Sequence, residues 1–164
     1  MLTISRRFSL ALISLALATI ILHDRCAALL VIRGDGELAA GHTAAAHTFY
    51  ARALWFRPRS EEAAERLVFS DLEAGNLEQL HEAMRVSADA LAIEPKNAGL
   101  WTDRALCASR LGDDRDAEIA FDRAGRLTHD GRLLYLSALA AHRLGENVDI
   151  RLYESHRAGA GRRA

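Results

Sequence analysis

The sequence is poor in several residue types, and each shortage excludes a class of protein. Its 164 residues include two cysteines, two prolines and 6% aromatic residues. Neither cysteine, Cys26 or Cys107, belongs to a CxxC pair, which argues against a metal or redox site, so both are interpreted as buried or idle thiols. The net charge of −1 gives no overall field to recruit nucleic acid or to steer an anionic substrate. One lysine, Lys96, stands against twenty arginines, which indicates the coding bias of a GC-rich, bacterial genome.

Alanine is abundant, and the stretch 101–124 shows how it is used. Apolar residues recur at spacings of four, three and three, on one face of a helix: Trp101, Ala105, Ala108 and Leu111. Gly112 can take the left-handed conformation that ends a helix, and Asp113 can cap the next one. Ala117, Phe121 and Ala124 continue the apolar face. The stretch predicts two helices joined by a tight turn.

This hairpin is one copy of a repeated unit. Gly41, Gly75 and Gly112 each follow a first apolar-faced segment, and Pro58, Pro95 and His129 each follow a second one. In every copy two alanines stand twelve and five positions before that terminator: Ala46 and Ala53, Ala83 and Ala90, Ala117 and Ala124. The unit is about 34 residues long, with three extra residues after Gly75, and this period predicts a helical array. The helix over residues 76–93 is therefore expected to be about one turn longer than its counterparts.

At these positions the chain resembles the tetratricopeptide repeat family. The third unit has Trp101, Ala105, Gly112, Ala117, Phe121 and Ala124; the first has Leu30, Gly34, Gly41, Ala46, Tyr50, Ala53 and Pro58. The second has Ala64, Val68, Gly75, Ala83, Ala90 and Pro95, with Ser87 where an aromatic residue is usual, and a partial fourth has Leu134, Ala138 and Gly145. The resemblance implies an all-α solenoid of helical hairpins, about three and a half repeats long, preceded by an apolar N-terminal helix.

The predicted organisation has three parts. Residues 1–25 form a signal anchor or transmembrane helix, residues 26–158 the repeat domain, and residues 159–164 a disordered basic tail. The repeats cover about 27–60, 61–97, 98–131 and, in part, 132–158.

The repeat positions also carry packing expectations. Small residues such as Ala105 and Ala117 let helices approach closely, so Ala117→Leu should lower the melting temperature. Gly34 is expected where a neighbouring backbone comes close, although glycine weakens a helix by roughly 1 kcal/mol relative to alanine. Trp55 and Phe56 are expected to be buried against the next unit; exposed, they would form a docking patch.

The N-terminal segment has three open interpretations. Residues 8–22 carry no charge, follow Arg6 and Arg7, and end at His23. They form an uncleaved signal anchor, a cleaved signal peptide, or a buried helix that caps the array. Fifteen residues are fewer than the ~20 that a spanning helix needs. By the positive-inside rule, the two arginines place the repeats on the periplasmic side of a bacterial inner membrane, or in the periplasm after cleavage.

The sequence offers no catalytic motif, and it predicts no enzyme, cofactor or metal. The seven histidines are interpreted as surface residues, because none forms H-x-x-x-H with a carboxylate. The acidic cluster of residues 113–116 lacks the ligand spacing of a calcium loop. An accessory role in an enzyme system through His42, His47 or His81 is the remaining alternative of that class.

The resemblance instead places function on the concave face lined by the first helix of each pair. Carried over by register, the partner-binding groove consists of Glu65, Phe69, Leu72, Thr102, Leu106, Ser109, Arg110, Tyr135, Leu139 and His142. We expect it to bind a peptide or helix of a protein partner, with no nucleic acid and no small-molecule substrate. The predicted function is a membrane-anchored scaffold that assists a pilus, secretion or cytochrome-maturation complex. The alternative is an integral structural subunit whose helix over residues 8–22 packs within a larger membrane complex.

Overall fold

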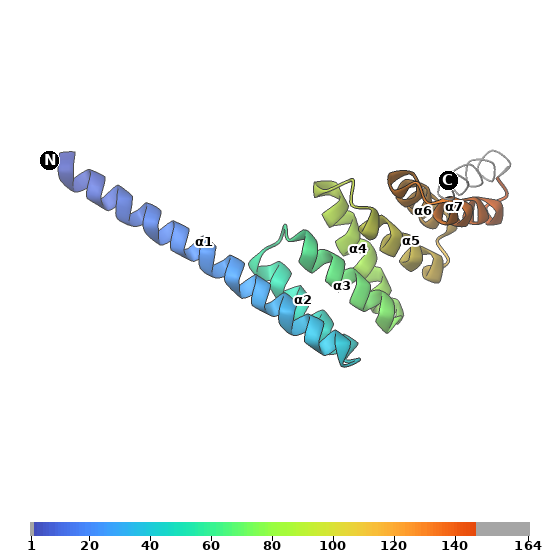
Figure 1. Cartoon of the computed structure of the whole chain (residues 1–164), viewed down its shortest axis with the longest axis horizontal. Coiled ribbons are helices and arrows are strands. Elements are labelled where there is room, and N and C mark those ends of the chain that lie inside the picture. Colours follow the sequence, from blue (N-terminus) through green and yellow to red (C-terminus); the bar gives the residue numbers. More distant parts are fainter. Residues whose placement is uncertain (1, 147–164) are drawn as a thin grey trace, which may run out of the picture. The chain divides into compact units, whose positions relative to one another are not determined.

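The computed structural model describes residues 2–146, and the side chains of residues 12–146. The described residues form seven α-helices and no strand (Figure 1). These helices are α1 (Leu2–Ala39), α2 (Thr43–Phe56), α3 (Glu61–Ala74), α4 (Leu77–Ile93), α5 (Ala98–Leu111), α6 (Asp114–Thr128) and α7 (Gly131–Arg143). The predicted all-α array of helical hairpins behind an apolar N-terminal helix is confirmed. The predicted tail over residues 159–164 and the part of the fourth predicted repeat from residue 147 onward lie outside the described residues.

The turns lie where the repeat pattern predicts them. The four glycines that end the first helices of the repeats all have positive φ: Gly41, Gly75, Gly112 and Gly145. The second helices begin with side-chain caps where Asn76 and Asp113 accept hydrogen bonds from backbone amides at 2.9 and 3.0 Å. His129, which replaces proline in the third repeat, ends α6 in the left-handed conformation with φ of 53°. A residue that must adopt this conformation cannot be proline, because the proline ring holds φ near −65°.

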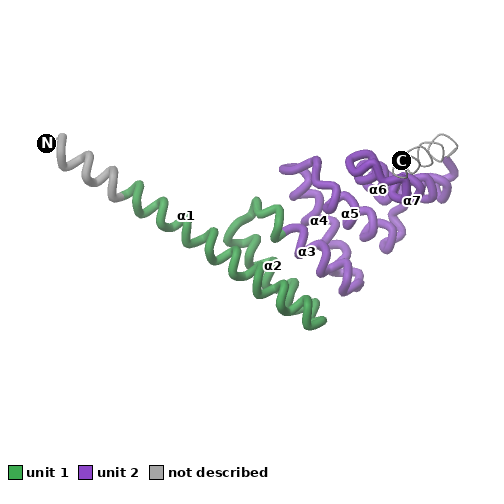
Figure 2. The backbone as a smooth tube through the Cα atoms, viewed as in Figure 1, with its two compact units in different colours: residues 1–63 green, residues 64–164 purple. Residues whose placement is uncertain are grey.

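Two compact units divide the chain at residues 63 and 64 (Figure 2). In the first unit, α2 runs antiparallel to the second half of α1. Side chains of α2 meet α1 in reverse order: His42 contacts Glu37 at 3.0 Å, the hydroxyl of Tyr50 donates to Asp35 at 2.8 Å, and the ring of Phe56 lies 5.6 Å from that of His23.

Gly34 occupies a tight position in this hairpin, but not for the predicted reason. A Cβ placed on Gly34 would lie 2.5 Å from the Tyr50 ring. The close neighbour is therefore an aromatic side chain and not a backbone. Tyr50 is fully buried, so its ring has no free direction in which to move.

The N-terminal part of α1 extends beyond α2. Residues 12–25 are all exposed, including the large apolar side chains from Leu12 to Leu22, whereas Ala27 and Val31 are buried. The interpretation as a buried capping helix is therefore wrong for residues 12–22. The stretch Leu12–Ala39 is long and apolar enough to cross a membrane, with a mean hydropathy of 1.9 over an 18-residue window, although a signal sequence would meet the same criterion. The predicted boundary at residue 25 falls inside this one continuous helix.

Trp55 and Phe56 differ from their expected burial. Trp55, at the end of α2, is 75% exposed, and Phe56 is half-buried against His23. The expectation that Trp55 is buried is wrong. Helical periodicity explains the difference, because Tyr50 and Ala53 occupy the buried face and Trp55 follows Ala53 by only two positions.

The second unit has a core made largely of alanine. Ala105 and Ala108 of α5, Ala117, Ala120 and Phe121 of α6, and Ala140 of α7 form one buried cluster. The alanines allow the helix backbones to approach closely, and Phe121 fills the space between them. Trp101 packs against this cluster only in part, because its indole N–H reaches out to donate to the Pro95 carbonyl at 2.9 Å. As predicted, α4 is longer than the other second helices of the described repeats, with 17 residues against 14 for α2 and 15 for α6.

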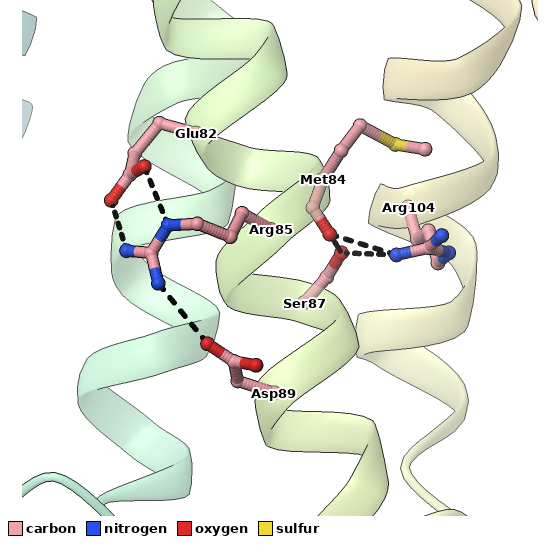
Figure 3. Close-up of polar contacts among 6 residues, drawn as sticks. All are labelled: Glu82, Met84, Arg85, Ser87, Asp89 and Arg104. Atoms are coloured by element: carbon pink, nitrogen blue, oxygen red, sulfur yellow. Dashed lines mark hydrogen bonds and ion pairs between the residues drawn. The ribbon is translucent and has the colours of Figure 1, made fainter.

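Ser87 occupies the position in the second repeat where the first and third have Tyr50 and Phe121. Arg104 of α5 reaches this position, and its guanidinium donates to the Met84 carbonyl at 2.8 Å and to the Ser87 hydroxyl at 3.3 Å (Figure 3). Its other edge donates to Asp116 of α6, with Nε at 3.2 Å from the carboxylate. One arginine thus links three helices where an aromatic ring is missing.

Candidate functional site

The first helices of the second and third repeats, α3 and α5, lie side by side in parallel. At one end, Asn97, which caps α5, donates a hydrogen bond to Glu65 of α3. At the other end, Arg110 of α5 donates to the carbonyl of Leu72 near the end of α3. α7 is linked to α5 through Ala140, which belongs to the same buried cluster as Ala105 and Ala108. We call the surface carried by these three helices the α3–α5–α7 face.

Four large apolar side chains are exposed on this face. Their exposed fractions are 41% for Phe69, 37% for Leu106, 52% for Tyr135 and 39% for Leu139. The remaining predicted residues divide into three groups: Glu65, Thr102 and Ser109 are half-buried, Arg110 and His142 are exposed, and Leu72 is buried. The side chain of Leu72 is therefore not available at the surface, whereas its carbonyl holds Arg110.

The N-terminal end of the face is acidic, because Asp103, which is not among the predicted groove residues, lies there with the predicted Glu65. Burial raises the pKa of Asp103 to about 6, and the nearby carboxylate of Glu65 adds to the shift. Asp103 stands three residues before Leu106 and seven before Arg110, so the helical spacing already placed it beside them. Together Glu65 and Asp103 form an anionic pair at one end, opposite Arg110 at the other.

Cys107 lies behind this face and is chemically quiet. Its side chain is fully buried, and this burial raises the pKa of its thiol to about 12. The thiol is therefore protonated at neutral pH and lacks the thiolate that redox or metal chemistry requires. Cys26 is half-buried in α1, and both cysteines are free thiols.

The histidines are dispersed over the described part of the chain. His23, His42, His81, His129 and His142 are exposed, and His47 is half-buried; His156 lies outside the described residues. Within residues 2–146, no group of three or more histidine, cysteine, aspartate or glutamate residues is placed to hold a metal ion.

Comparison with known proteins adds a fold but no relative in sequence. No family model matches the chain, and no curated protein matches it. Solved structures do: a MamA structure designated MSR-1 C2 aligns with a TM-score of 0.70 and 15% identity, covering 84% of this chain and 79% of that one. MamA from Desulfovibrio magneticus RS-1 aligns with a TM-score of 0.69 and 16% identity, covering 82% and 76%. The TPR domain of Arabidopsis OM64 aligns with a TM-score of 0.63 and 18% identity, covering 74% and 96%.

The chain has a tetratricopeptide-like fold. At these identities the likeness concerns the fold alone, and it agrees with the 34-residue period and with the glycine at each turn.

Proposed function

We propose that the protein is a protein-interaction scaffold that binds a peptide or helix of a partner on the α3–α5–α7 face. The observation that carries this proposal is the exposure of Phe69, Leu106, Tyr135 and Leu139 on the first helices of three successive repeats. Helix-in-groove recognition uses such a row of apolar positions, spaced to receive the apolar face of an amphipathic segment.

The charges on this face specify the partner further. Glu65 and Asp103 lie at one end, and Arg110 lies at the other. A partner segment with a basic residue at one end and an acidic residue at the other would bind in one orientation. Opposite-charge pairing at the rim of an interface contributes more to orientation and partner choice than to affinity.

The second part of the proposal is that α1 anchors this scaffold in a membrane. Residues 8–22 alone would span only about 22 Å at 1.5 Å per residue, but the part of α1 over residues 2–22 would span about 31 Å. The hydrocarbon core of a bilayer is about 30 Å thick. Arg6 and Arg7 stand near the start of this stretch in the sequence, before the uncharged residues 8–22. By the positive-inside rule, these two arginines belong on the cytoplasmic side of the membrane, and the repeats then lie in the periplasm of a bacterial cell.

We further propose that the partner belongs to a membrane or envelope complex whose assembly the scaffold assists, of the pilus, secretion or cytochrome-maturation type. An anchored scaffold acts on partners that share its membrane, because anchoring raises their effective concentration.

The test of partner binding is a cross-linking pull-down with the full chain. Phe69→Glu combined with Leu106→Glu should remove the specific partners, because two carboxylates then face the apolar side of the bound segment. The matched control is Leu77→Glu with Ile119→Glu, two side chains that are 68% and 48% exposed on the second helices α4 and α6. Identical partner sets from both variants would contradict binding on this face.

A photoreactive residue at Leu15 tests the role of α1. Leu15 is 65% exposed, and in a simple anchor it faces lipid. Photolysis in membranes should then leave the chain uncross-linked to protein. A single, reproducible protein adduct would instead support the alternative, an integral subunit whose N-terminal helix packs within a larger complex.

A further inference from the structure

The end of α2 meets α1 at the point where the exposed apolar segment of α1 stops. The rings of Phe56 and His23 lie 5.6 Å apart at an interplanar angle of 62°, and Arg57 Nε lies 3.6 Å from the Asp24 carboxylate. The end of α2 and the turn that follows it, together residues 55–59, are therefore held beside residues 19–24 of α1, where the exposed apolar segment ends at Leu22.

A hollow of about 480 Å³ lies between this turn and α1. Thr19, Ile20 and His23 line it from α1, and Phe56, Arg57 and Arg59 line it from the turn. Its wall thus combines apolar side chains with two guanidinium groups. The side chains of Arg57 and Asp24 are 57% and 50% exposed, so water weakens their ion pair, and the guanidinium retains donors for a further acceptor.

Trp55 stands beside this hollow with most of its indole uncovered. It is 75% exposed and contacts Phe56 edge-on, with ring centroids 4.8 Å apart. Tryptophan is enriched at membrane–water interfaces, because its ring is apolar while its N–H needs a polar partner. An exposed tryptophan next to two arginines, at the end of an exposed apolar helix, fits the boundary between hydrocarbon and headgroups.

We propose that this hollow binds the phosphate headgroup of a phospholipid from the membrane that α1 enters, with Trp55 at the hydrocarbon boundary. The inference rests on the membrane anchoring proposed above. Arg57 and Arg59 donate to the phosphate oxygens, while Ile20 and Phe56 contact the start of an acyl chain. Asp24, which also lines the hollow and pairs with Arg57, offsets part of this positive charge, so recognition depends on directed hydrogen bonds to phosphate and not on a net positive field.

Bromolipid quenching of Trp55 tests this placement in the full chain reconstituted into vesicles. The chain has two tryptophans, so the difference in emission between wild type and Trp55→Phe isolates Trp55. Lipids brominated near the headgroup end of their chains should quench this difference signal about twofold more than lipids brominated near the methyl end, as expected of an interfacial ring. Flotation after an alkaline wash reports separately whether the chain is anchored.

A second measurement tests recognition of the phosphate. Brominated phospholipid is diluted with a phosphate-free glycolipid, and Trp55 quenching is followed against the bulk composition. In the wild type, phospholipid should be enriched around Trp55 about fivefold over the bulk, the factor that about 1 kcal/mol supplies. Arg57→Gln combined with Arg59→Gln should remove this enrichment. Arg123→Gln with Arg132→Gln, which removes equal charge from exposed sites in the second unit, should retain it.

Each alternative outcome is decisive. If the chain floats after the wash but Trp55 is not quenched, the headgroup site is overturned and the anchor stands. If Trp55 is quenched but follows the bulk composition in the wild type, the turn meets lipid without selecting phosphate, and the site is again overturned. A chain that fails to float overturns both the anchor and the site that depends on it.

Discussion

The second and third repeats fill the same position by different chemistry. In the third, Phe121 is 4% exposed and closes a cluster of alanines from α5, α6 and α7. Thirty-four residues earlier, Ser87 is fully buried but too small to do so, and Arg104 of the next repeat fills the position with hydrogen bonds. The comparison shows that an apolar residue stabilises its repeat from within, whereas the second repeat depends on a side chain from its neighbour.

The largest loss of stability is expected when Phe121, the apolar residue at this position in the third repeat, is truncated. Phe121→Ala should lower the free energy of unfolding by about 3–5 kcal/mol, because a buried ring is lost and a cavity remains among side chains that are already small. Urea unfolding followed by circular dichroism measures it. A loss below about 1 kcal/mol would mean that the alanine cluster can collapse into the space, and that Phe121 does not determine the packing.

Removing Arg104, the polar substitute in the second repeat, should cost less stability than removing Phe121, but it should affect two repeats at once. Arg104→Met should lower the free energy of unfolding by about 2–3 kcal/mol, because Asp116 and the Met84 carbonyl each lose a charged donor. The arginine and aspartate side chains are 17% and 22% exposed, which places the effect below that of a fully buried pair.

Two variants make this prediction specific. Ser87→Ala should cost only about 1 kcal/mol, since the Met84 carbonyl still holds the guanidinium. Arg123→Met, at an exposed site on α6, should stay within about 0.5 kcal/mol. Equal losses from Arg104→Met and Arg123→Met would show that the bridge between α4 and α6 contributes no net stability.

The first repeat uses a third arrangement, a glycine beneath a tyrosine, and it offers an internal control. Gly34→Ala should lower the free energy of unfolding by about 1–2 kcal/mol, because overpacking against the Tyr50 ring exceeds the gain in helix propensity. Gly36→Ala, two residues on in the same helix, places its Cβ in open space and should stabilise by up to about 1 kcal/mol. If both substitutions shift the melting curve in the same direction, the contact between Gly34 and Tyr50 is not tight.

The smallest effect is expected on the α3–α5–α7 face and depends on pH. The pKa of Asp103 is raised to about 6 in the folded chain, from an ordinary value near 3.8, so the folded state binds this proton more tightly than the unfolded state. This contribution to stability is therefore complete below pH ~4 and is lost as the pH rises to about 6. Above that pH, Asp103→Asn should stabilise the chain by about 1 kcal/mol, with allowance for the partial exposure of the side chain.

The difference in unfolding free energy between wild type and Asp103→Asn, measured from pH 4 to pH 7, isolates this group from other carboxylates. A difference that does not vary with pH would show that Asp103 titrates normally. A bound partner with a basic residue near Asp103 should lower the pKa of this carboxyl, which links the measurement to the proposed binding face.

Much of the fold was predictable because its signals are local. Gly41, Gly75, Gly112 and Gly145 end helices through their own backbone freedom, and the three extra residues after Gly75 lengthen the helix that contains them. The exposed row of Phe69, Leu106, Tyr135 and Leu139 also followed from register, because residues at equivalent positions of a helical repeat face the same way. Asp103 was not predicted, because the groove residues were taken from the binding positions of the tetratricopeptide repeat family and the residues next to them on α5 were left out.

Other features were decided by packing between helices. Three contacts join residues that are 16, 17 and 38 positions apart in the sequence: Gly34 with Tyr50, Ser87 with Arg104, and Leu72 with Arg110. No helical period relates such residues, and the conformation of a long arginine side chain depends on which acceptors surround it.

By itself the sequence determined the repeated helical hairpins and the glycines at their turns, because these follow from backbone conformation and from the spacing of apolar residues along one helix. It did not determine that the apolar N-terminal segment and the first helix of the first repeat form one continuous helix, α1. Only the tertiary structure decided that Trp55 is exposed, that Arg104 fills the place of an aromatic ring, and that the end of α2 lies beside the end of the apolar segment of α1. Those outcomes depend on the distances between helices. A repeat pattern alone does not set these distances, because they also depend on side-chain volumes and on hydrogen bonds between helices.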